Sequence, residues 1–260
     1  MNSLADQYFK LERKRDFFAR EKKYIAFKKT YSSKLKLPNK NTGNFWDAKF
    51  SSHEEMMLND PMENDRNKKA FELFEKYSKV GSNTLNIGCG DGNFETLLVK
   101  SKKRFQHTAS DIALKSLKNL KKRFKRFEFI KLNIVGVKNR LEQDYDMITM
   151  FEVLEHISPS DTLKVLATIN KSLKKNGYFM ISVPMNEGLE DMFPNNPNEH
   201  LRCYTENIIM SELKISGFKV IENHVFYAFK KYYFLKKILA KTLLKNHWKP
   251  NNILLLTQKP

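Results

Sequence analysis

Cysteine, long apolar runs and acidic charge are all scarce in this 260-residue sequence. The two cysteines, Cys89 and Cys203, are too few for a disulfide framework and too far apart in sequence to suggest a metal-binding pair. No apolar run approaches the roughly 20 residues that a membrane-spanning helix requires. Asp6 and Glu12 interrupt the first residues, which lack the apolar core of a secretory signal. We expect a cytoplasmic protein that at most lies on a membrane surface.

The shortage of acidic residues leaves a formal net charge of +18, from 47 basic and 29 acidic side chains. A basic surface raises the local concentration of phosphate-rich ligands or anionic lipids. An equally acceptable interpretation is that isolated lysines on solvated faces keep the protein soluble. Hydrophobic residues make up 41% and aromatic residues 12%, which indicates a folded chain rather than a disordered one.

Glycine is infrequent too, yet Gly88, Gly90 and Gly92 occupy alternate positions in one short stretch. Apolar residues precede the stretch and a helix-like pattern follows from Phe94, which indicates a buried strand, a tight turn and a helix start. Such a turn lets the backbone approach a ligand, and the helix N-terminus offers N–H donors. The dinucleotide-binding pattern G-x-G-x-x-G is not matched, because Asn93 stands in place of its third glycine. A glycine-rich turn that binds nothing is the alternative.

Strand and helix patterns alternate from residue 82 onward, which is typical of a parallel sheet with helices on both faces. The expected strands cover 83–87, 105–110, 127–132, 145–151, 177–183, 218–227 and 252–258. The expected helices cover 92–101, 113–124, 137–142, 160–173 and 205–216.

Two further helices are expected ahead of this region. Residues 4–31 carry a basic amphipathic pattern, and residues 63–77 place apolar side chains on one face. A linker is expected at 34–42, so we divide the chain into an extension, 1–45, and a domain, 46–260. The basic helix suits nucleic acid, lipid headgroups or docking onto the domain, and docking is the favoured interpretation.

Polar residues follow the second and fourth expected strands. Asp111 lies about 20 residues after the glycine turn, where a carboxylate accepts hydrogen bonds from ribose hydroxyls. The same residue is suited to cap the next helix. Glu152, Glu155 and His156 lie at i, i+3 and i+4, which puts all three on one face of a helical turn. A divalent cation or a substrate network would offset the repulsion between the two carboxylates.

The glycine-rich stretch resembles motif I of the class I S-adenosylmethionine-dependent methyltransferases, and the resemblance extends over residues 70–258. Residues 173–184 look like the turn into the family's fifth strand, and residues 200–205 resemble the stretch before its last helix. The resemblance implies an α/β, Rossmann-like sheet of seven mostly parallel strands, with helices on both faces, an N-terminal helical extension and a helical insert before the last strand. It also implies that S-adenosylmethionine is bound by Asn86, Gly88, Cys89, Gly90, Asp111, Ile112, Asn133 and Phe151.

Within that superfamily, Glu-x-x-Glu-His with a later histidine resembles the ubiquinone-biosynthesis O-methyltransferases and the small-RNA 2′-O-methyltransferases. The resemblance implies a Mg²⁺ site, or one for another divalent metal, formed by Glu152, Glu155, His156 and His200. His156 or His200 would act as general base, with or without the metal. The motif also occurs in family members that bind no metal, so both alternatives stay open.

Two positions of the family pattern call for separate interpretations. Asn133 resembles the residue that meets the adenine amino group, and a turn asparagine is the alternative. Asn86 stands where the family usually has an acidic residue that orders the glycine loop and the charged methionine end of the cofactor. Asparagine keeps the hydrogen-bond geometry but loses the charge, which predicts weaker cofactor binding and leaves a non-catalytic protein as an alternative.

The insert at 229–245 combines a broad apolar face with paired lysines. This pattern suits an interfacial helix on an anionic membrane, a substrate lid, a helix docked in a groove, or ordinary packing and dimerisation.

We therefore predict an S-adenosylmethionine-dependent methyltransferase that acts on an oxygen of a small or lipophilic, membrane-associated acceptor. An RNA 2′-O-methyltransferase would use the same four residues and the basic surface, although no RNA-binding motif is recognisable. A non-catalytic binding protein on the same scaffold is the second alternative.

Overall fold

The computed structural model describes residues 40–53, 60–142, 144–187, 199–229, 231–244 and 247–260. The helix expected over 4–31 lies outside these residues, as does most of the linker expected at 34–42. The strands are β1 (Asn83–Ile87), β2 (Gln106–Asp111), β3 (Glu128–Lys131), β4 (Tyr145–Phe151), β5 (Leu173–Pro184), β6 (Lys219–Phe226) and β7 (Asn252–Gln258). The helices are α3 (Gly43–His53), α4 (Pro61–Tyr77), α5 (Asn93–Leu98), α6 (Leu114–Arg123), α7 (Pro159–Ser172), α9 (Glu206–Ile215) and α10 (Tyr233–Lys241), with 3₁₀ turns η3 (Ile134–Gly136) and η4 (Leu154–His156).

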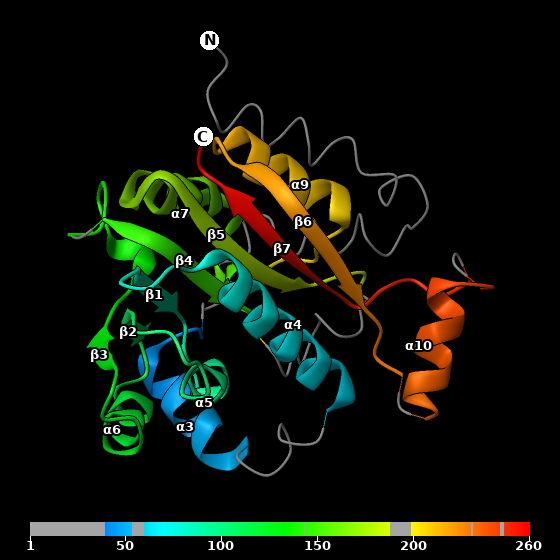
Figure 1. The fold of residues 1–260 in the computed structure, drawn as a ribbon, viewed down its shortest axis with the longest axis horizontal. Coiled ribbons are helices and arrows are strands. Elements are labelled where there is room, and N and C mark those ends of the chain that lie inside the picture. The colour runs from blue at the N-terminus through cyan, green and yellow to red at the C-terminus, as the bar shows by residue number, and fades with distance from the viewer. Residues whose placement is uncertain (1–39, 54–59, 143, 188–198, 230, 245–246) are drawn as a thin grey trace.

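Seven strands of the described chain form one sheet in the order β3-β2-β1-β4-β5-β7-β6 (Figure 1). Strands β1 to β5 pair in parallel, whereas β7 lies antiparallel between β5 and β6. Because β7 opposes both neighbours, β6 runs in the same direction as β5. The C-terminal ends of β1, β4, β5 and β6 therefore share one edge. The predicted seven-stranded, mostly parallel sheet is confirmed.

Both faces of the sheet are covered, because successive residues of the central strands point to opposite sides. In β5, Phe179 and Ile181 belong to the core that includes residues of α7 and α9, and Met180 to the core that includes residues of α4, α5 and α6. In β7, Ile253 and Leu254 divide in the same way. Continuous apolar strands are what a sheet buried on both faces requires.

The expected helix at 137–142 is wrong, since only the short turn η3 follows β3. The side chain of Asn133 accepts a hydrogen bond from Val135 N and so closes that turn. Leu141 N donates to Ser172 Oγ at 2.7 Å, so a tertiary contact takes the place of a helical bond. None of the described helices has both the length and the apolar character to cross a bilayer.

Helix α3 was not expected, and it packs against α6. Asp47 Oδ1 accepts a 2.7 Å hydrogen bond from Lys115 N at the N-terminus of α6. This carboxylate replaces a local cap, because the N-cap residue Ala113 has no polar side chain. The boundary drawn between 45 and 46 falls inside α3, and the division of the chain into 1–45 and 46–260 stays a prediction.

Candidate active site

A cavity of about 260 Å³ opens at the C-terminal ends of β1, β2 and β4. The strand order reverses between β1 and β4, which is where open α/β sheets bind ligands. The cavity is lined by Asn41, Trp46, Phe50, Ile87, Gly88, Asp111, Ile112, Leu132, Asn133, Ile134, Val135, Glu152, Val153, His156, Ile157, Ser158 and Asp161. Four of the predicted cofactor residues thus line one cavity: Gly88, Asp111, Ile112 and Asn133.

The glycine turn at the end of β1 is shaped by steric limits. Gly88 has φ of +77°, and a Cβ atom there would lie 2.2 Å from Cγ2 of Val153. Gly92 has φ of +76°, and its Cβ would lie 2.6 Å from Cδ2 of Leu120 in α6. Gly88 therefore lets the loop backbone border the cavity, and Gly92 lets α5 begin close to α6.

Asp111 ends β2, and its carboxylate holds the surrounding backbone. Oδ2 accepts a 2.9 Å hydrogen bond from Gly90 N, and Oδ1 accepts one of 2.9 Å from Ala113 N. Burial raises the pKa of Asp111, and the hydrogen bonds from Ala113 and Gly90 oppose that rise. A carboxylate oxygen accepts more than one hydrogen bond, so the capping role leaves room for a ribose contact, which stays a prediction.

The other predicted cofactor residues, Asn86, Cys89, Gly90 and Phe151, are not among the residues that line the cavity. Cys89 is buried, which raises the pKa of its thiol, and Phe151 packs edge-on against Phe94 with ring centroids 5.0 Å apart. Asn86 points into the core, where Nδ2 donates to Glu95 Oε1 at 2.8 Å. The carboxylate missing at position 86 is therefore supplied next to it by Glu95, which is fully buried.

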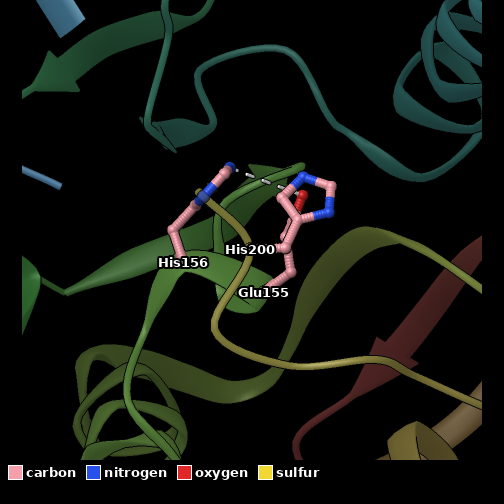
Figure 2. A group of neighbouring side chains, drawn as sticks. All are labelled: Glu155, His156 and His200. Atoms are coloured by element: carbon pink, nitrogen blue, oxygen red, sulfur yellow. Dashed lines mark ion pairs between the residues drawn. The ribbon is translucent and has the colours of Figure 1, made fainter. Parts of the chain in front are cut away.

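Glu155 and His156 of η4 meet His200 beside the cavity, and the three side chains point toward one another (Figure 2). Their donor atoms all lie within 4.8 Å of one another. Glu155 Oε1 lies 3.8 Å from His156 Nε2, and the two imidazole centroids are 4.9 Å apart. His156 also lines the cavity, so the cluster adjoins the predicted cofactor site.

Acceptor groups orient both imidazole rings through Nδ1. His156 Nδ1 lies 3.3 Å from the carbonyl oxygen of Glu199, and His200 Nδ1 lies 2.7 Å from Glu187 Oε1. These contacts favour a proton on Nδ1 and a lone pair on Nε2, the usual arrangement of metal-binding histidines. Burial, followed by the neighbouring His200, lowers the pKa of His156 to about 3, so this ring is neutral.

Glu155 is the feature of the cluster that most needs a ligand. Its side chain is fully buried, and neither oxygen accepts a hydrogen bond from any other described residue. Burial accordingly raises the pKa of Glu155 well above its usual value. A buried carboxyl group that accepts no hydrogen bond is costly unless a cation or a donor joins it.

Glu152 is not part of this cluster, although the resemblance placed it there. Its Oε2 contacts Arg66 Nη1 at 3.0 Å and Asn252 Nδ2 at 2.8 Å, and its Oε1 accepts a 2.6 Å hydrogen bond from Ser182. Glu152 also has φ of +53°, in the left-handed region that few non-glycine residues adopt. Among the described residues, the structure therefore brings together three of the four predicted metal ligands.

Several residues that matter at the site were not identified from the sequence. Glu187 orients His200, and its only signal was an acidic residue shortly after the fifth strand. Arg66 is buried on α4, four residues before the buried Ala70, so a cation on the apolar stripe was a usable signal. Trp46 of α3 also belongs to the site, since its ring centroid lies 4.8 Å from that of His156.

The sequence profile of the family described as "Methyltransferase domain" matches residues 62–223, which is more than half of the chain. The chain belongs to this methyltransferase family. It is an S-adenosylmethionine-dependent methyltransferase of class I, as the glycine motif and the strand order indicate. None of the curated proteins matches this methyltransferase in sequence.

Solved structures show the same fold at low sequence identity. The N-methyltransferase NodS from Bradyrhizobium japonicum WM9, in complex with S-adenosyl-L-homocysteine, is 16% identical over 85% of this chain and 99% of its own, with a TM-score of 0.62. An S-adenosylmethionine-dependent methyltransferase from Clostridium acetobutylicum ATCC 824 is 14% identical over 81% and 98%, with a TM-score of 0.57. The glycopeptide N-methyltransferase MtfA, complexed with sinefungin, is 14% identical over 75% and 87%, with a TM-score of 0.53.

Proposed function

We propose that this methyltransferase transfers the methyl group of S-adenosylmethionine to a hydroxyl oxygen of a small or lipophilic acceptor. The observation that carries the proposal is the cluster of Glu155, His156 and His200 beside the cavity. A free amine already has a nucleophilic lone pair, whereas a hydroxyl needs help in losing its proton. A cluster of this kind is thus of most use to an oxygen acceptor. NodS and MtfA are N-methyltransferases, but their 16% and 14% identities indicate a shared fold only.

In this proposal the cofactor lies in the cavity, with its ribose at Asp111 and its adenine near Asn133. Gly88 lets the methionine end pass close to the backbone, where a larger residue would collide with Val153. The fold supports this placement, since the NodS and MtfA structures hold S-adenosyl-L-homocysteine and sinefungin. Trp46 and Phe50 of α3 form part of the cavity wall and reduce access of water.

The donor set of the cluster fits a divalent metal ion. It offers one buried carboxyl group whose oxygens accept no hydrogen bond from the described residues, and two histidines whose Nδ1 atoms are engaged by Glu199 O and Glu187. Two imidazoles favour Mn²⁺, Fe²⁺, Co²⁺ or Zn²⁺, whereas Mg²⁺ prefers oxygen ligands. Once bound, such a cation would lower the pKa of a hydroxyl group coordinated to it. Three protein ligands leave coordination positions for that hydroxyl.

The reaction is an in-line displacement. The acceptor oxygen forms a bond to the methyl carbon as the carbon–sulfur bond breaks, and the hydroxyl proton passes to a base. His156 borders both the cavity and the cluster, so without a metal its Nε2 is placed to take that proton, and with a metal bound it would instead help to orient the acceptor. The rest of the rate enhancement comes from positioning of the two reactants.

An RNA acceptor is the second candidate, and one observation favours it. A groove of about 360 Å³ adjoins the cavity through the shared residues Ile134, Val135 and Asp161. Lys138, Lys164 and Lys171 line this groove and would attract a phosphate backbone. Such a substrate would present its 2′-hydroxyl to the same cluster.

The test measures methyl transfer to a lipophilic phenol and to a single-stranded RNA, each with Mn²⁺, with Mg²⁺ and with a chelator. We expect transfer to the phenol, stimulation by Mn²⁺ and loss of that stimulation in His200→Asn. The matched control is His224→Asn, a partly exposed histidine paired with Glu222 far from the cavity. Transfer to RNA alone would establish the second candidate, and transfer only to amines would refute both.

A further inference from the structure

Helix α10 leaves the sheet at the same edge as the active site. It lies in the connection between the end of β6 and the start of β7, and β6 runs parallel to β5 (Figure 1). The connection therefore begins at the edge formed by the C-terminal ends of β4 and β5, where Glu152 hydrogen-bonds to Asn252, the first residue of β7.

One face of α10 is anchored to α4. Tyr233 OH donates a 2.7 Å hydrogen bond to Asp65 Oδ2, and Lys237 forms an ion pair with the same carboxylate. Ala240 is buried on this side, one turn further along the helix. The anchored face fixes the direction in which the opposite face points.

The opposite face is apolar and exposed. Phe234 is 70% exposed, Leu235 59% and Ile238 60%, and Leu243 just beyond the helix is 85% exposed. Large apolar side chains in a contiguous exposed group mark an interaction site. At 3.6 residues per turn, Lys241 lies at one edge of this apolar face, and Lys236 lies beyond the other edge, past the half-buried Leu239.

A basic groove of about 370 Å³ lies beside the apolar face, between α4, β6 and α10. Four lysines line it, and two of them are paired, Lys69 with Glu72 and Lys237 with Asp65. Lys68 and Lys241 also line the groove and form no ion pair with any described residue. The groove therefore carries uncompensated positive charge directly beside exposed hydrocarbon.

We propose that this surface, the apolar face of α10 with the lysine groove, docks the enzyme onto an anionic phospholipid membrane. Phe234, Leu235 and Ile238 would enter the boundary between headgroups and acyl chains, while the flanking lysines extend to phosphate groups. A second copy of the chain fits less well, because it would bring the same unpaired lysines face to face. A nucleic acid fits less well too, since Leu235 and Ile238 offer no aromatic ring for base stacking.

The experiment is flotation of the full chain with vesicles of phosphatidylcholine alone, or of phosphatidylcholine and phosphatidylglycerol in equal parts. We expect binding to the anionic vesicles only. The variant F234S/I238S should bind them at least about tenfold less strongly, because two large apolar side chains no longer leave water. The variant K236E/K241E should also bind less, with a weaker dependence on salt.

Two matched controls separate this surface from basic charge elsewhere. Val80→Ser changes an apolar residue that is 75% exposed ahead of β1, and K118E/K121E alters as much charge on α6. Both should keep wild-type binding, and all variants should keep their affinity for S-adenosylhomocysteine. Equal binding of F234S/I238S and the wild type would overturn the proposal. So would a solution dimer that this variant converts to monomers while neither protein binds vesicles. The assay contains no methyl acceptor, so its failure would leave the proposed O-methylation standing.

Discussion

The two halves of the active site differ in how their polar groups are satisfied. On the proposed cofactor side, the carboxylate of Asp111 accepts backbone hydrogen bonds on both oxygens, and Asn86 is paired with Glu95. On the proposed acceptor side, Glu155 is equally buried, yet neither of its oxygens accepts a hydrogen bond from any other described residue.

The cofactor side is therefore formed before a ligand binds, whereas the acceptor side still needs a ligand to satisfy its buried carboxyl group. A loop held by the hydrogen bonds of Asp111 and Asn86 keeps its shape without the cofactor and loses little entropy on binding. A buried carboxyl group beside two oriented histidines is unfavourable by itself and gains most when a cation or an acceptor arrives. Substitutions on the cofactor side should therefore change the stability of the fold, whereas substitutions on the acceptor side should change turnover.

The largest effect is expected on the cofactor side, from Gly88→Ala. Its φ of +77° and the 2.2 Å approach to Val153 should cost about 3 kcal/mol or more of unfolding free energy. The matched control is Gly81→Ala, with φ of +81° and open space around its Cβ, which should cost only about 1 kcal/mol. Urea unfolding measures both. Equal losses of unfolding free energy would show that the Val153 side chain moves aside and that the loop is not rigid.

Glu155→Gln tests the acceptor side. It should lower kcat about a hundredfold, or roughly 2.7 kcal/mol, while affinity for S-adenosylhomocysteine stays within about twofold. The free energy of unfolding should not fall, because the substitution removes no hydrogen bond. Glu72→Gln, which changes a surface acid on α4, is the control. A loss of stability as large as the loss of turnover would make the cluster a structural feature.

The variant Asn86→Asp tests whether Glu95 supplies the negative charge that the family usually has at position 86. A second carboxylate next to a buried one should cost about 2 kcal/mol of unfolding free energy. The double variant N86D/E95Q restores a single charge and should return to within about 1 kcal/mol of the wild type. The double-mutant cycle is measured by urea unfolding. Additive costs would show that the two side chains are not coupled.

Asp111→Ala should weaken binding of S-adenosylhomocysteine at least about tenfold, or 1.4 kcal/mol, in calorimetry. It removes the acceptors of Gly90 N and Ala113 N together with the predicted ribose contact. Asp144→Ala, an exposed acid paired with Arg140, should leave the affinity unchanged. Unchanged affinity in Asp111→Ala would remove the ribose assignment.

The smallest effect is expected outside both halves, at Glu222. Hydrogen bonds from Lys76 and then Tyr77 lower the pKa of Glu222 to about 2. Since the pKa is lower in the folded state, the stabilisation is complete above about pH 4.5 and is lost as the pH falls toward 2. Glu222→Gln should remove that part of the acid dependence, and only slightly, because the group lies at the surface. A large change in the acid dependence would mean that this surface pair contributes as much to stability as the groups of the active site.

Much of the fold could be predicted from the sequence. The alternation of apolar strands and amphipathic helices from residue 82 onward reflects local periodicity, which a single chain displays directly. The helix predicted at 137–142 was wrong, because hydrogen bonds to Ser172 and Asn133 hold this part of the chain in place of helical bonds of its own. Helix α3 was missed because its place depends on tertiary contacts with α6, where Asp47 Oδ1 accepts a hydrogen bond from Lys115 N.

The sequence by itself determined the kind of enzyme. Gly88, Gly90 and Gly92 lie within five residues, so the tight turn follows from a contiguous pattern, and the resemblance of that pattern to motif I indicated the cofactor.

Only the tertiary structure decided which residues act together. It joined His200 to Glu155, turned Glu152 toward Arg66, and placed Glu95 beside Asn86. Each of these partners comes from a different element of the chain. Sequence spacing cannot choose between such partners, because burial and charge pairing are settled only when the elements pack.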